Sequence, residues 1–91
     1  MNPITRAGLR KLVDDFRQSV FKTRVMTIVK GIYDGVLAAA HAGLSTYRET
    51  TEVSREIAED VDKELHRLLV GCILSYKRDV YGNIQGIEVI W

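Results

Sequence analysis

The sequence predicts a small α+β domain in which two or three helices pack against a sheet built on a C-terminal β-hairpin. Apolar residues recur at helical spacing over much of the first 70 positions, whereas the final segment, CILSYKRDVYGNIQGIEVIW, alternates as paired strands do. Ninety-one residues with 46% apolar content and one proline are typical of a single globular domain. We therefore expect one domain over 1–91.

The amino-terminal part contains two apolar stripes at helical spacing, behind a possible helix start at Asn2 and Pro3. The first stripe comprises Leu9, Leu12, Val13, Phe16 and Val20, and the second comprises Val25, Ile28, Val29, Ile32, Val36 and Ala40. Their centres lie roughly 150° apart around a helix. Either the helix breaks between Ser19 and Arg24, or it continues and its amino half packs against another molecule. This divides the chain into a basic amphipathic helical arm over 1–24 and a helix-strand-helix-hairpin core over 25–91.

In the middle of the chain, the sequence pattern predicts a short strand followed by a further helix. The alanine run favours helix up to Gly43, and the alternating segment Leu44–Arg48 is rich in strand formers. Thr50 or Thr51 is expected to cap the next helix, which Gly71 ends. Its apolar face would contain Val53, Ile57, Val61, Leu65, Leu68 and Leu69.

The C-terminal hairpin is predicted to close on a two-residue turn at Gly82 and Asn83. That turn would set Lys77 opposite Glu88, Tyr76 opposite Val89, and Leu74 opposite Trp91. One face would then gather apolar side chains, so we expect Trp91 to be buried beside Leu74, Tyr76, Ile87 and Val89.

Charge is distributed unevenly, although the net charge is only +1. Residues 1–30 hold seven basic and two acidic residues, whereas residues 49–64 hold seven acidic and two basic ones. Arg10, Arg17 and Arg24 recur at intervals of seven and give the arm a basic edge. This edge could meet an acidic protein surface, in the same chain or another, or follow nucleic-acid phosphates. The residues concerned are Arg6, Arg10, Lys11, Arg17 and Arg24.

Composition also excludes some classes of protein. The lone Cys72 rules out an internal disulfide, and the charged amino terminus lacks the apolar core of a signal peptide. The most apolar window contains Lys30, Asp34 and His41, so we expect no membrane span. The expected location is intracellular.

No pattern of catalytic or metal-binding residues emerges. His41 lies in the last turn of its helix, where an imidazolium favours the negative helix end. Asp62 and His66 are one helical turn apart, but a hydrolase built on them with Cys72 would lack an oriented nucleophile. Zinc, calcium and phosphate-loop spacings are missing as well. We therefore expect no enzyme, no metal, no cofactor and no small-molecule substrate, and we expect His41 and Cys72 to be structural.

The segments from Ile32 onward, about two thirds of the chain, carry the motifs AAAHAGLSTY and IEVIW. In this they resemble small proteins of unassigned function in large eukaryotic DNA viruses and tailed phages. Those proteins share a helix ending in paired alanines and glycine, a serine/threonine-tyrosine strand, a second helix and a closing hairpin. This chain has Leu69-Val70-Gly71 where many of them have Phe-Pro before the hairpin. The resemblance implies a small viral protein and supplies no catalytic residue.

Two functional hypotheses follow from these observations. The first is a non-enzymatic structural or assembly protein that acts through protein–protein contacts, most simply as a homo-oligomer joined by the first apolar stripe. The second is a nucleic-acid-binding accessory module that uses the basic amino-terminal helix.

Overall fold

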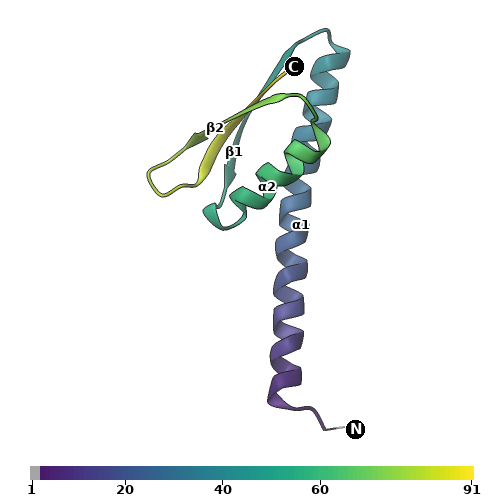
Figure 1. Ribbon diagram of the computed structural model, residues 1–91, viewed down its shortest axis with the longest axis vertical. Helices are drawn as coiled ribbons and strands as arrows, with labels where there is room; N and C mark the ends of the chain where they lie inside the picture. The colour runs from purple at the N-terminus through teal and green to yellow at the C-terminus, as the bar shows by residue number, and fades with distance from the viewer. Residues whose placement is uncertain (1–2) are drawn as a thin grey trace.

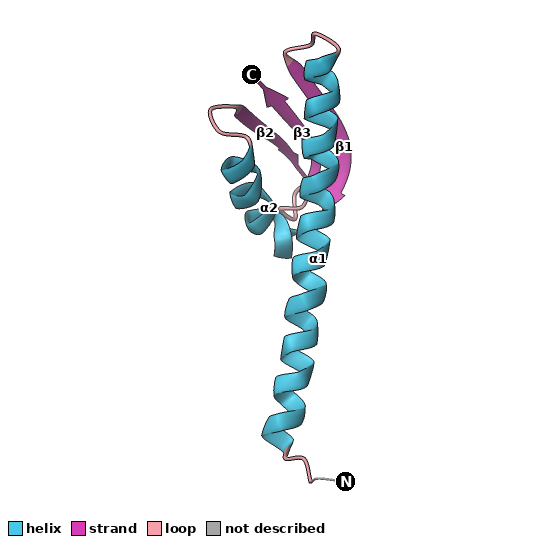
Figure 2. Cartoon of the chain, turned by 90° about the vertical axis from the view of Figure 1, so that its right-hand side faces the viewer, coloured by secondary structure: helices cyan, strands magenta, loops and turns pink. Residues whose placement is uncertain are grey.

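The computed structural model describes residues 3–91, which form two helices and a three-stranded antiparallel sheet (Figure 1). In chain order the elements are α1 (Arg6–His41), β1 (Thr46–Val53), α2 (Arg55–Leu68), β2 (Ile73–Arg78) and β3 (Ile84–Ile90). The strand order is β1-β3-β2, so the last strand is central. Both helices lie on one face of the sheet (Figure 2). The predicted α+β class and the C-terminal hairpin are confirmed.

Helix α1 is continuous over 36 residues and does not break between Ser19 and Arg24. It begins at Arg6 behind Thr5, whose side-chain oxygen accepts a hydrogen bond from the Gly8 backbone N–H at 3.0 Å. The predicted start at Pro3 is therefore wrong, and Asn2 lies outside the described residues. Pro3 and Ile4 precede the Thr5 cap and lie outside the helix.

The core lies between the carboxyl half of α1, α2 and the inner face of the sheet. The second apolar stripe supplies it from α1, with Ala39 buried in place of the predicted Ala40. Each large side chain buried here contributes about 1.5–3 kcal/mol relative to exposure. The buried set comprises Val25, Val29, Ile32, Val36, Val53, Ile57, Ala58, Val61, Leu65, Leu69, Ile84, Ile87 and Val89.

The boundary between β1 and α2 differs from the prediction. Strand β1 extends to Val53, and Ser54, rather than Thr50 or Thr51, caps α2 through a 3.4 Å hydrogen bond from the Glu56 N–H. Threonine serves both as a cap and as a strand former, and pairing with β3 decides between these roles. Val53 is therefore a buried strand residue rather than part of the helix face.

The hairpin register is two residues away from the predicted one. Leu74 pairs with Val89, Tyr76 with Ile87, and Lys77 with Gly86. A shift of two preserves the alternation, so the inner face still gathers the predicted side chains, except Trp91. Trp91 follows the end of β3 and is 39% exposed, so its predicted burial is wrong.

Asp79 accounts for this shift. Its carboxylate accepts hydrogen bonds from the backbone N–H groups of Tyr81 (2.9 Å) and Asn83 (3.0 Å), and its own N–H donates to the Asn83 carbonyl at 3.0 Å. These contacts close a longer loop than the two-residue turn expected at Gly82 and Asn83. The Asn83 side-chain oxygen also accepts from the Arg55 N–H at 2.9 Å, which ties the loop to the start of α2.

Helix α1 lies against β1 at Gly35, where the Tyr47 ring occupies the space that a Cβ atom would fill. At Gly31, one turn earlier, a Cβ would meet nothing within 4 Å. The two glycines share the same helix but lie in different surroundings, so they form a matched pair.

We predict opposite effects of alanine at these two positions. Gly31→Ala should raise the free energy of unfolding by about 0.5–1 kcal/mol, because alanine loses less backbone entropy on helix formation. Gly35→Ala should lower it by about 1–3 kcal/mol, because the methyl group overlaps the Tyr47 ring. Urea denaturation followed by circular dichroism measures both. Equal effects of the two substitutions would contradict the contact.

Candidate interaction surface on the helical arm

The amino half of α1 projects away from the domain as a single helix (Figure 1). We call residues 6–24 the arm, since Val25 is the first fully packed residue of α1. At 1.5 Å per residue α1 measures about 54 Å, and the molecule is 60 Å long. The length of the molecule is therefore set by one helix, of which the arm is about half.

The apolar stripe, defined as Leu9, Leu12, Val13, Phe16 and Val20, lies exposed on the arm. The exposed fractions of these residues range from 42% for Val20 to 69% for Phe16. The stripe is on the side of α1 opposite the core, because the two sets of apolar residues point in nearly opposite directions around one continuous helix. A contiguous row of large apolar side chains that remains in water is a candidate interaction surface.

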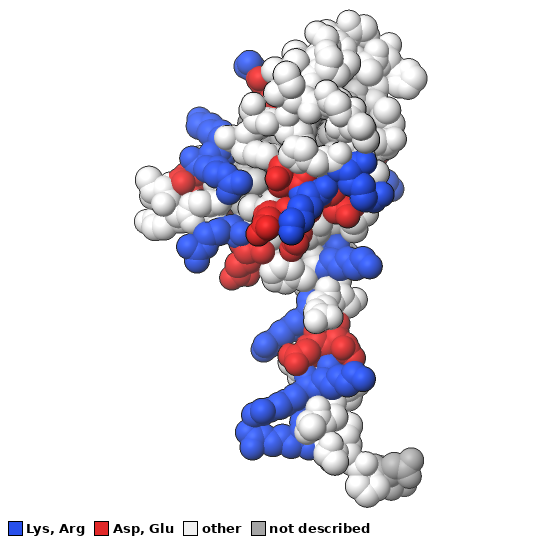
Figure 3. Space-filling view, viewed as in Figure 1, with Lys and Arg blue, Asp and Glu red and all other residues white. Residues whose placement is uncertain are grey.

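The basic residues of the arm form no ion pair within 4.0 Å among residues 3–91. All the ion pairs among residues 3–91 lie outside the arm. They are Arg48–Glu88, Lys63–Glu59 (3.3 Å), His66–Asp62 (3.1 Å) and Arg67–Glu64 (2.9 Å). Figure 3 shows basic groups along the arm and a concentration of acidic groups at the level of α2. The expected attraction between the arm and the acidic segment 49–64 of the same chain thus produces no ion pair within 4.0 Å among residues 3–91.

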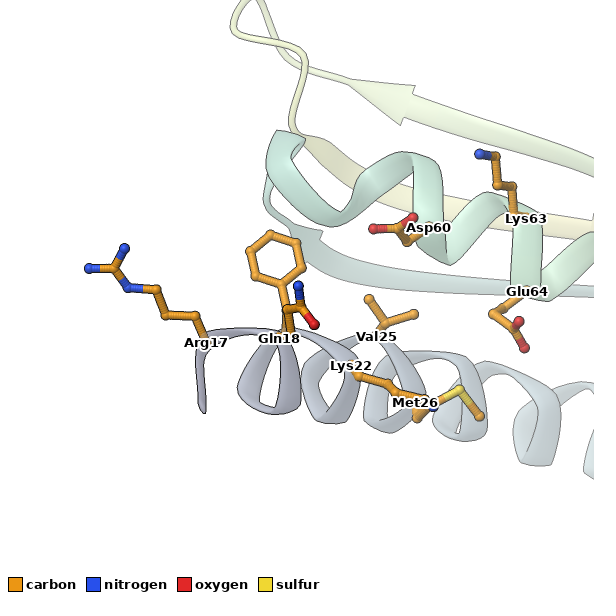
Figure 4. A pocket seen from close by; sticks show the side chains of 9 residues that line it. Arg17, Gln18, Lys22, Val25, Met26, Asp60, Lys63 and Glu64 are labelled. Atoms are coloured by element: carbon orange, nitrogen blue, oxygen red, sulfur yellow. The ribbon is translucent and has the colours of Figure 1, made fainter. Parts of the chain in front are cut away.

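A groove of about 480 Å³ opens where the arm meets α2 (Figure 4). Phe21, Val25 and Met26 of α1 give it an apolar floor, and Asp60 and Glu64 of α2 lie along its rim with basic residues of both helices. This groove is on the inner side of α1, whereas the apolar stripe is on the outer side. The two features therefore face in different directions from α1.

The sequence-predicted pair Asp62 and His66 is part of a small polar cluster beside β2. His66 Nδ1 lies 3.1 Å from Asp62 Oδ1, and the Tyr76 hydroxyl donates a hydrogen bond to the same carboxylate oxygen. Burial raises the pKa of the Tyr76 phenol above its usual value near 10, and the hydrogen bond to Asp62 raises it further. The carboxylate is thus held by a tyrosine that links α2 to the sheet, which is a structural arrangement.

Sequence reasoning missed the link to Tyr76, because no helical or strand spacing relates Asp62 on α2 to a residue of β2. The available signal was the position of Tyr76 on the inner face of β2, where a phenol needs a hydrogen-bond acceptor. Cys72 is half-buried against the core, and His41 is exposed in the last turn of α1. Neither residue joins the Asp62 cluster through a hydrogen bond or an ion pair in the part of the chain described.

The described residues contain no group of three potential metal-ligating side chains. Within the same range, neither helix has the length and apolarity needed to cross a membrane. Comparison with protein-family models, curated proteins and solved structures finds no match for this chain. The interpretation of the arm therefore depends on the geometry and chemistry of its own residues.

We predict that Tyr76→Phe lowers the free energy of unfolding at pH 7 by about 1 kcal/mol, the net value of a lost hydrogen bond. Because the folded pKa lies above the unfolded one, this contribution is complete below pH 10 and declines as the pH rises further. The deficit of the variant should therefore shrink between pH 7 and pH 11. Urea denaturation at both pH values measures it.

Tyr81→Phe provides the control, because Tyr81 is 73% exposed and should show no deficit at either pH. A Tyr76→Phe deficit that stays constant up to pH 11 would contradict the assigned cause.

Proposed function

We propose that this protein is a non-enzymatic assembly protein whose apolar stripe binds a second copy of the same chain. The observation that carries the proposal is the exposure of five large apolar side chains along one side of a helix that the domain holds in place. The other end of the same helix is packed into the core. The arm is thus a fixed extension that carries an uncovered apolar surface.

The energetics of an isolated helix support association. A single helix in water gains little from its own hydrogen bonds, and most helices in proteins are stabilised by burying an apolar face. Within residues 3–91, no sheet or helix lies against the apolar stripe. Covering the stripe with an identical surface would remove it from water on both copies at once, as a two-fold dimer does.

The resemblance to small viral proteins is compatible with this function. A short chain that forms a larger particle by self-association suits a virion or another viral assembly. We propose such a setting for the protein, with the host cytoplasm or the virion as its location.

We predict that the double substitution Leu12→Asp with Phe16→Asp converts the assembly to a folded monomer. Phe16→Asp would place a carboxylate at the centre of the stripe, where it would be buried without a partner, and Leu12→Asp removes a second large apolar side chain from the stripe. Multi-angle light scattering gives the mass, and circular dichroism confirms that the helices remain. The control is Ala7→Asp with Gln18→Asp, which adds the same charge on exposed arm residues outside the stripe.

The control variant should retain the mass of the wild-type assembly. A wild-type protein that remains monomeric at high concentration would refute the proposed function.

A second candidate, nucleic-acid binding, is favoured by one specific observation. The basic residues of the arm form no ion pair with acidic residues among residues 3–91 and remain exposed along a straight helix. Such an edge can follow a phosphate backbone, with an affinity that falls steeply as salt rises.

We predict that, if the arm binds nucleic acid, affinity for duplex or single-stranded DNA is measurable at 50 mM salt and falls by at least about tenfold at 200 mM. Fluorescence anisotropy at the two concentrations measures this. The matched variant is Arg10→Gln with Arg17→Gln, which should weaken binding if the edge carries it. An absence of binding at 50 mM salt would remove this candidate.

A further inference from the structure

The apolar stripe follows the 3-4 spacing of a coiled-coil seam. Leu9, Val13, Phe16 and Val20 are separated by four, three and four residues, and the same spacing continues to Thr23 and Thr27. In heptad terms Leu9, Phe16 and Thr23 occupy d positions, and Val13, Val20 and Thr27 occupy a positions. Leu12 flanks the seam at a g position. The 3-4 spacing therefore extends beyond the arm to Thr27, which lies in the part of α1 that packs on the core.

The two threonines are compatible with a dry interface. The Thr23 hydroxyl donates to the Ser19 carbonyl at 2.9 Å, and the Thr27 hydroxyl donates to the Thr23 carbonyl at 2.8 Å. Both hydroxyl groups are thus satisfied by the backbone of their own helix and need no water or partner. The seam can be covered over the full length from Leu9 to Thr27.

The residue types in the seam favour a coiled coil of two parallel helices. All three a positions are β-branched, and β-branched residues at a with leucine at d are typical of parallel dimers. Phe16 and Thr23 replace leucine at the other two d positions. Coiled coils of three or four helices are favoured instead by isoleucine at d, which this seam lacks.

The arginines distinguish parallel from antiparallel pairing. Arg10, Arg17 and Arg24, the residues that recur at intervals of seven, all occupy e positions. In an antiparallel pair the e positions face each other, which sets Arg17 against Arg17 and Arg10 against Arg24. In a parallel pair the e position faces g, so Arg17 meets Leu12 and Arg24 meets Ser19. Only the parallel pair avoids three contacts between like charges.

The domain does not obstruct this arrangement. The core packs on the opposite side of α1 from the seam, and Thr23 and Thr27 are exposed although they lie beside the domain in sequence. Two parallel arms would therefore carry their domains at the same end and on outer sides. Because the core already holds α1 helical from Val25 onward, the arm extends an existing helix and avoids the cost of nucleation.

We infer that the partner of the apolar stripe is a second copy running parallel, in a two-stranded coiled coil from Leu9 to Thr27. This inference depends on the proposed self-association and adds the direction and register of the pair. Beyond Thr27 the next seam positions are Lys30 and Asp34, whose like charges would face each other in the pair. The coiled coil accordingly ends at Thr27.

Disulfide trapping tests the direction. Leu9→Cys and Thr27→Cys are made separately in a Cys72→Ser background, and each is oxidised alone and in an equal mixture. In a parallel pair identical cysteines meet, so each variant alone forms a covalent dimer and the mixture forms no Leu9→Cys to Thr27→Cys product. In an antiparallel pair the identical cysteines are about 27 Å apart, at 1.5 Å for each of 18 residues, and only the mixture yields a covalent dimer. Oxidation in guanidinium provides the control in which both kinds of product form.

Each result decides the question together with light scattering of the wild-type chain. Self-linked dimers alone support the inference. Mixed dimers, or an associating protein that forms neither product, overturn the parallel seam while the proposed self-association stands. A monomeric wild-type chain overturns both.

Discussion

The rest of the structure depends on the packing of one side of α1 against α2 and the sheet. Val29 and Ile32 are completely buried there, and each contributes about 1.5–3 kcal/mol to the folded state. Because α1 continues without a break, fixing this side fixes the direction of every side chain on the same helix. The apolar stripe faces water as a geometric consequence of burying the other side of the same helix, further along the chain.

The periodicity of the sequence was enough to identify both sides of α1, but not the continuity of the helix. Residues at helical spacing define a direction, and two opposed directions are equally compatible with one straight helix and with two helices that fold back. The outcome depends on tertiary contacts: within residues 3–91 no other element covers the apolar stripe, whereas Phe21 and Val25 already join the core. Local sequence does not contain that information.

The sheet shows the same distinction between pattern and position. Alternation assigned Leu74, Tyr76, Ile87 and Val89 to the correct face, because a shift of two residues leaves the facing of every side chain unchanged. The register itself was set by the Asp79 carboxylate, whose bonds to backbone N–H groups lengthen the turn. Trp91 consequently lost its cross-strand neighbour Leu74. The residues of the candidate site were therefore predictable from sequence, while the register and the Asp62–Tyr76 link required the structure.

The arm also raises a question of energy. Ordering a residue costs about 1–2 kcal/mol in backbone entropy, and the residues of the apolar stripe recover little of this within their own chain. Association would supply the missing burial, so the helicity of the arm and the formation of the assembly should be coupled.

The arginines beside the stripe give this coupling a recognisable dependence on salt. In a parallel pair the arginines would not contact each other, but they would still bring positive charge from two copies towards one axis. Salt would screen this longer-range repulsion and strengthen association. On nucleic acid the same residues would release counterions, so salt would weaken binding. The two functions that one basic, amphipathic helix can serve therefore respond to ionic strength with opposite sign.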